Sequence, residues 1–150
     1  MRRLLLVRHA STDAVRAAAF GADEPLDAQG REAAARLRLP QGEVWVSPAL
    51  RARETAACAG LTVTGVEPAL AECDFGAWAG RRLSELGEDA LREWMTDPAA
   101  APHGGVVKAA VIEALSAPPE AFWRVDVAPL SVTELHAHDG SWTVTRVNAS

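Results

Sequence analysis

The apolar run Leu4-Leu5-Leu6-Val7 ends at Arg8-His9, and this junction constrains the fold more than any other segment of the chain. Four consecutive apolar residues favour a buried strand, which we expect over residues 3–8. Ligands of open α/β sheets bind outside the carboxyl ends of the strands. A guanidinium there can clamp a phosphate, and a neutral imidazole is a nucleophile. The alternative is a strand end that carries two solvated polar side chains.

Helical and extended segments alternate along the rest of the chain. Asp27 is the expected N-cap of one helix, and Ser47 with Pro48 is the expected start of another. The expected helices cover residues 28–39, 48–59, 82–95 and 105–116. The expected later strands cover residues 43–46, 62–70, 131–136 and 142–147. This order predicts an α/β fold with a mostly parallel central sheet flanked by helices. Asp139-Gly140 predicts the turn of an antiparallel C-terminal hairpin.

Length and charge narrow the class of protein. The 150 residues fit one domain, so we expect residues 1–150 to form a single domain. A net charge of −5 argues against nucleic acid as a partner but allows a local cationic pocket. No apolar run is long enough for a membrane helix, so no membrane partner is expected. Cys58 and Cys73 lack CxxC spacing, which indicates reduced thiols and a cytoplasmic protein.

A second arginine follows the second expected strand. Arg51 lies in the first turn of the expected helix, where free backbone N–H groups favour anions, and Thr55 shares its face. A dianion at this sheet edge would meet Arg8, Arg51 and His9 together. The alternative is a surface helix with scattered arginines, of which Arg53 would be one.

Residues 70–80 contain two carboxylates beside aromatic residues and glycines. A carboxyl group near apolar side chains can act as a general acid, which makes Glu72 a candidate and Asp74 a weaker one. An ordinary acidic loop with its aromatic rings in the core is the alternative.

These three segments resemble, in order, the motifs of the histidine phosphatase superfamily, which is also called phosphoglycerate-mutase-like. Leu6–Thr12 looks like its nucleophile motif, residues 47–56 like its second arginine motif, and residues 70–80 like its acid loop. His103-Gly104-Gly105 looks like a fourth motif, in which a histidine opens a helix. The resemblance covers roughly residues 3–95, and residues 130–147 look like the closing hairpin of the family.

The resemblance implies the role of each site residue. His9 would attack phosphorus, and Glu72 would protonate the leaving alcohol and then activate water. His103 is expected both as a catalytic residue and as a phosphate ligand. The other expected phosphate ligands are Arg8, Arg51 and Thr12. No cofactor and no metal are expected, since arginines neutralise the phosphate.

The segment before His103 departs from the family pattern. Only thirty residues separate Glu72 from His103, and the proline-rich residues 97–102 cannot form a central strand. We therefore expect a helix and a strand of the family pattern to be absent. The chain could have a new sheet edge covered by a partner chain in a homodimer, the given sequence could omit residues, or the fold could be rearranged.

The expected activity is metal-independent hydrolysis of a small phosphorylated metabolite through phosphohistidine. Esters of the α-ribazole type, sugar phosphates and phosphoglycerate are possible substrates. Two alternatives stay open: a non-catalytic, anion-binding remnant of the family, and a phosphoryl transferase of the phosphoglycerate mutase type, which a short lid region disfavours.

Overall fold

The computed structural model describes residues 2–72, 75–96 and 105–150. The chain divides into two compact units. Unit 1 comprises the described residues within Met1–Arg8 and Gly104–Ser150, and unit 2 comprises those within His9–His103. Both units combine helices with strands, which confirms the predicted α/β class. The expected single domain over residues 1–150 stays a prediction.

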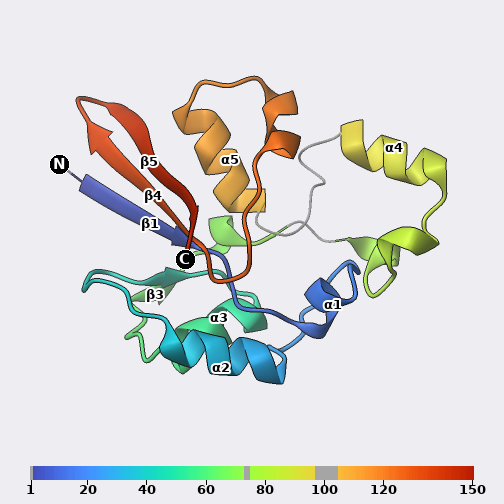
Figure 1. Ribbon diagram of the computed structural model, residues 1–150, viewed down its shortest axis with the longest axis horizontal. Helices are drawn as coiled ribbons and strands as arrows, with labels where there is room; N and C mark the ends of the chain where they lie inside the picture. Colours follow the sequence, from blue (N-terminus) through green and yellow to red (C-terminus); the bar gives the residue numbers. More distant parts are fainter. Residues whose placement is uncertain (1, 73–74, 97–104) are drawn as a thin grey trace. The chain divides into compact units, whose positions relative to one another are not determined.

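Unit 1 is built on a three-stranded antiparallel sheet (Figure 1). Strand β4 (Val132–His138) lies between β1 (Arg2–Val7) and β5 (Ser141–Ala149). Helix α5 (Gly105–Ala114) contacts β5 and the 3₁₀ segment η5 (Pro119–Arg124). The core of this unit consists of buried apolar side chains, namely Val107, Val111, Phe122, Val127 and Leu135.

The predicted hairpin is confirmed. Its two strands pair from His138 opposite Ser141, which leaves Asp139-Gly140 as a two-residue turn. Both turn residues have positive φ, 46° at Asp139 and 80° at Gly140. Tight hairpin turns of this kind need positive φ at both positions, and Asp-Gly tolerates it at low cost.

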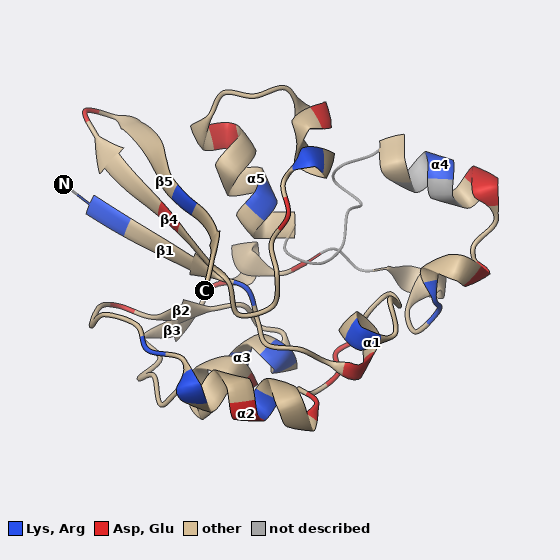
Figure 2. Ribbon diagram, in the orientation of Figure 1, with Lys and Arg blue, Asp and Glu red and all other residues tan. Residues whose placement is uncertain are grey.

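Unit 2 carries the short strands β2 (Trp45–Val46) and β3 (Gly65–Val66), which pair in parallel. Its α-helices are α1 (Asp13–Arg16), α2 (Ala28–Arg36), α3 (Leu50–Cys58) and α4 (Glu88–Thr96). Its 3₁₀ segments are η1 (Pro68–Leu70), η2 (Gly76–Trp78) and η3 (Leu83–Glu85). The α2 and α3 helices pack together. Figure 2 shows that α2 carries both acidic and basic residues.

An aromatic cluster anchors the core of unit 2. Phe20 is 1% exposed, and its ring centroid lies 5.2 Å from that of Phe75 and 5.5 Å from that of Trp78. Tilted rings at this spacing stabilise each other beyond simple burial. The cluster therefore attaches the described second half of the predicted acid loop, residues 75–80, to the core of the same unit.

The mostly parallel central sheet is not confirmed. The three-stranded sheet contains only antiparallel pairs, and the parallel pair involves two residues from each strand. The alternation of strands and helices predicts parallel neighbours only if consecutive strands pair with each other. Here β1 pairs with β4, from the other end of the chain, so the strand order decides the direction.

The helix starts were predicted with mixed success. Asp27 is the N-cap of α2, and its Oδ1 accepts from the N–H of Gly30 at 2.6 Å. The Ser47-Pro48 start of α3 is wrong: the N-cap is Ala49, which makes no side-chain capping bond. Asp23 serves that helix instead, because its Oδ1 accepts from the N–H of Leu50 at 2.7 Å. A carboxylate 27 residues away thus satisfies a free N–H of the first turn.

Candidate active site

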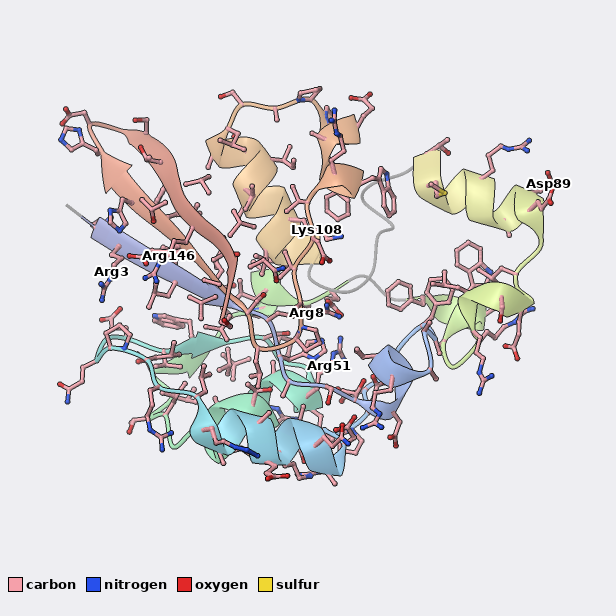
Figure 3. The ribbon with its side chains drawn as sticks, viewed as in Figure 1. Arg3, Arg8, Arg51, Asp89, Lys108 and Arg146 are labelled. Atoms are coloured by element: carbon pink, nitrogen blue, oxygen red, sulfur yellow. The ribbon has the colours of Figure 1, made fainter. Side chains whose placement is uncertain are left out.

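Arg51 is the centre of a buried polar cluster in unit 2. It projects from the first turn of α3 (Figure 3) and is 8% exposed. Its Nε donates to Nε2 of His9 at 3.2 Å, and its Nη2 donates to Oε2 of Glu72 at 2.6 Å. Its Nη1 donates to the carbonyl of Ala22 at 3.1 Å. One guanidinium thereby joins the expected nucleophile and the expected general acid.

The hydrogen bonds of His9 define its tautomer. The ring Nδ1 lies 2.7 Å from the carbonyl oxygen of Ala10, which can only accept, so Nδ1 carries a proton. The ring Nε2 accepts from Arg51 and therefore carries none. The imidazole is neutral, with the lone pair of Nε2 on the side of the guanidinium. This is the protonation state that a nucleophilic histidine requires.

The start of α2 holds the loop that follows His9. The carbonyl of Ser11 accepts from the N–H of Asp27 at 3.1 Å, and the hydroxyl of Ser11 donates to Asp27 Oδ1 at 2.8 Å. Gly30 packs so closely that a Cβ there would lie 2.3 Å from the Ser11 oxygen. The backbone after the nucleophile is therefore held by a helix end that only a glycine can approach.

Thr12 is fully buried as the N-cap of α1. Its hydroxyl donates to Glu24 Oε1 at 3.0 Å and accepts from the N–H of Val15 at 3.2 Å. The expected phosphate ligand thus has a local structural role in this structure, and its role toward phosphate stays a prediction. His103 and Asp74 lie outside the described residues.

Arg8 belongs to unit 1, where its Nη1 donates to the carbonyl of Val127 at 2.6 Å. Lys108 of α5 lies in the same unit, with Nζ 5.3 Å from the ring centroid of Phe122. Burial lowers the pKa of Lys108, Asp126 opposes that shift, and the positive charge of Arg8 adds to it. Unit 1 therefore holds a second cation within electrostatic range of Arg8, which the sequence analysis did not single out.

The loop of residues 21–26 was also missed. Its backbone and carboxylates reach two separate helices. Ala22 contacts Arg51 of α3 and Asp23 caps the same helix, whereas Glu24 accepts from Thr12, the N-cap of α1. The only signal in the sequence is a pair of acidic residues before a proline, Asp23-Glu24-Pro25. That signal predicts a turn, and it carries no information about which distant donors the carboxylates meet.

Among the residues that the structure describes, no group of three or more His, Cys, Asp or Glu side chains could hold a metal ion. In the same part of the chain, no helix is long and apolar enough to cross a bilayer.

The residues of the cluster lie within the match to a known family. The model of the histidine phosphatase superfamily (branch 1) matches residues 4–102 and 99–150. The chain belongs to the histidine phosphatase superfamily. A search of curated proteins gave no match.

Three solved structures that share the fold are described as phosphatases, one of them putative. The phosphoserine phosphatase of Entamoeba histolytica in complex with 3-phosphoglyceric acid aligns at a TM-score of 0.86 and 18% identity, covering 100% of this chain and 98% of that one. A mycobacterial glucosyl-3-phosphoglycerate phosphatase with VO3 aligns at 0.83 and 23%, covering all of both chains. A putative α-ribazole-5'-P phosphatase of Escherichia coli aligns at 0.82 and 22%, covering 100% and 98%. At these identities the likeness establishes the fold.

Proposed function

We propose that this protein hydrolyses small phosphate monoesters through a phosphohistidine on His9. The observation that carries the proposal is that the Arg51 guanidinium contacts both the unprotonated Nε2 of His9 and the carboxylate of Glu72. A nucleophile, a cation and an acid are the groups that phosphoryl transfer through histidine needs. The phosphatase fold of the family supports the same chemistry.

In the first step, Nε2 of His9 attacks phosphorus and the bond to the ester oxygen breaks. The leaving oxygen takes its proton from the carboxylic acid of Glu72. In the second step, Glu72 accepts a proton from water, the resulting hydroxide attacks phosphorus, and the P–N bond breaks. Phosphate leaves, and His9 and Glu72 return to their starting protonation states.

The pair between Arg51 and Glu72 implies an order of events. An ionised carboxylate bound to a guanidinium cannot donate a proton. A phosphate that takes the Nη2 donor of Arg51 displaces Glu72 from that bond. Without its cationic partner the carboxylate is easier to protonate, so substrate binding prepares the acid.

Arg8 is proposed as a second phosphate ligand because it is the covalent neighbour of His9. The proposed roles of Thr12 and His103 as further phosphate ligands rest on the family motifs alone. The neighbouring structures name phosphoserine, glucosyl-3-phosphoglycerate and α-ribazole-5'-P phosphatases, which defines the substrate panel to test. We place the reaction in the cytoplasm, without a cofactor.

The first experiment is hydrolysis of p-nitrophenyl phosphate by the full chain, with and without EDTA. We expect turnover that EDTA does not change, and loss of turnover in His9→Ala. His138→Ala is the matched control, since that histidine is exposed on the hairpin and pairs with Asp139. A labelled phosphoenzyme, quenched in alkali because phosphohistidine is labile to acid, should form with the wild type and not with His9→Ala.

Two results would replace the proposal. Binding of vanadate with no turnover of any ester in the panel indicates the anion-binding remnant. Faster phosphoryl transfer to an added alcohol or phosphoglycerate than to water indicates a transferase of the mutase type.

A further inference from the structure

Thr55 makes two hydrogen bonds that connect the helix of Arg51 to the loop of His9. The side chain lies on α3 and is 6% exposed. Its Oγ1 donates to the carbonyl of Arg51 at 2.7 Å and accepts from the N–H of Ala10 at 3.0 Å. The second of these bonds links Ala10 and Thr55, which are 45 positions apart in the chain.

The donor and acceptor roles of the Thr55 hydroxyl in these two bonds cannot be exchanged. A hydroxyl has one proton, and the carbonyl of Arg51 takes it, so Oγ1 can meet Ala10 only as an acceptor. This bond sets the plane of the peptide between His9 and Ala10, because the peptide unit is rigid. Ala10 is fully buried, so no solvent can replace Thr55 as the acceptor of that N–H.

The same residue, Ala10, sets the tautomer of His9. Its carbonyl oxygen accepts from Nδ1 at 2.7 Å, which keeps the proton on Nδ1 and leaves Nε2 unprotonated. A displaced Ala10 would weaken this bond, and the imidazole could then rotate or carry its proton on Nε2. A histidine with a protonated Nε2 has no lone pair at the atom that faces Arg51.

We propose that Thr55 is a positioning residue for the His9 imidazole. It holds the ring in its Nδ1-protonated tautomer and keeps Nε2 within hydrogen-bond distance of Arg51. The catalytic consequence rests on the proposed function, whereas the effect on the imidazole does not. Thr55 touches neither reacting atoms nor phosphate in this role. It acts through the peptide of Ala10 on one side and the backbone of Arg51 on the other.

The decisive variant is Thr55→Val, which keeps the shape of the side chain and removes both hydrogen bonds. Thr55→Ser restores the hydroxyl. Thr133→Val is the matched control, since Thr133 is also fully buried and its hydroxyl has no hydrogen-bond partner among the described residues. The readout is the pair of ring nitrogen resonances of His9 at about pH 8, where an ordinary imidazole is neutral. His9→Asn assigns them among the four histidines.

We expect the wild type, Thr55→Ser and Thr133→Val to show a protonated Nδ1 and an unprotonated Nε2. Thr55→Val should show the other tautomer or a mixture. If the proposed activity is confirmed, kcat for p-nitrophenyl phosphate should fall by about tenfold or more in Thr55→Val, because a misplacement of about 1 Å can cost ~100-fold. KM should change less, since Arg51 keeps its own donors.

An unchanged His9 tautomer in folded Thr55→Val overturns the inference, whatever its activity. Should that variant not fold, the wild type decides: a proton on Nε2 of His9, or fast exchange of the Ala10 amide with solvent, overturns it equally. A wild type without phosphatase activity contradicts the proposed function alone, because the tautomer measurement needs no turnover.

Discussion

Nη2 of Arg51 lies 2.6 Å from Oε2 of Glu72, and the two side chains are 9% and 13% exposed. A nearly buried ion pair of this kind is costly to break from one side, since the remaining charge is left without a partner. Phosphate is a suitable replacement for the carboxylate, because it offers acceptor oxygens to the same donors. The pair therefore links the proposed acid to the proposed phosphate clamp.

Glu72→Gln tests the proposed acid through the leaving group. The amide keeps an oxygen for Arg51 and cannot donate a carboxylic proton. We expect kcat for an alkyl phosphate to fall by about 100-fold or more, the usual range of general acid catalysis. For p-nitrophenyl phosphate the first step should change much less, because its phenolate leaves without a proton.

The matched control for that experiment is Glu120→Gln, since Glu120 is exposed in unit 1. Equal losses in the rate of the first step on both esters, measured as the burst of released alcohol or phenolate, would contradict the role of Glu72 as the acid.

Arg51→Lys tests the phosphate clamp. Lysine keeps the charge and loses the planar fork that reaches His9, Glu72 and Ala22 at once. We expect the affinity for inorganic phosphate, measured by calorimetry, to fall by about 10- to 100-fold, as for the loss of one charge-assisted bond of ~1.5–3 kcal/mol. Arg53→Lys, on the exposed side of the same helix, should bind phosphate as the wild type does. Equal affinities of the two variants would exclude Arg51 from the phosphate site.

Gly30→Ala tests the close approach of α2 to the loop after His9. In an ordinary helix this substitution stabilises by about 1 kcal/mol. Here the added Cβ would meet the Ser11 oxygen at 2.3 Å and the Ser11 nitrogen at 3.0 Å. We expect the free energy of unfolding, from urea titration, to decrease by about 1–3 kcal/mol, the cost of overpacking. Gly42→Ala is the control, since nothing lies within 4 Å of its Cβ position; a stabilised Gly30→Ala would contradict the packing.

Glu134 provides a pH test of unit 1. Hydrogen bonds from His136 and then from Arg146 lower the pKa of its carboxyl group from the ordinary value of 4.5. A lowered pKa in the folded state stabilises the protein above the unfolded value, and this contribution is lost as pH falls through the folded value. Figure 3 shows Arg3 and Arg146 on the sheet that carries Glu134.

We therefore expect the wild type to be more stable than Glu134→Gln at pH 7, and the difference to shrink as the pH falls below about 4.5. Urea unfolding at several pH values measures it. A difference in the free energy of unfolding that stays constant from pH 7 to acidic pH would contradict the assignment.

Local sequence determined several features by itself. Asp27 caps α2 through an N–H three residues away, and Asp139-Gly140 turns β4 into β5 because these residues tolerate positive φ. The order of the motifs around His9, Arg51 and Glu72 predicted the family, which the family model confirms. Such features depend on neighbours in the chain or on residue types that a motif preserves, so reading the sequence is enough.

Only the tertiary structure decided what those residues contact. The acceptor for the Ala10 N–H is 45 residues away, the partner of His9 Nε2 is 42 away, and the carboxylate that meets Leu50 is 27 away. Strand direction in unit 1 likewise depends on β1 pairing with β4. A hydroxyl or a strand edge has many possible partners of the right chemistry, and periodicity does not distinguish between them. Burial of the apolar faces selects one arrangement, and the polar contacts are those that this arrangement brings within hydrogen-bond distance.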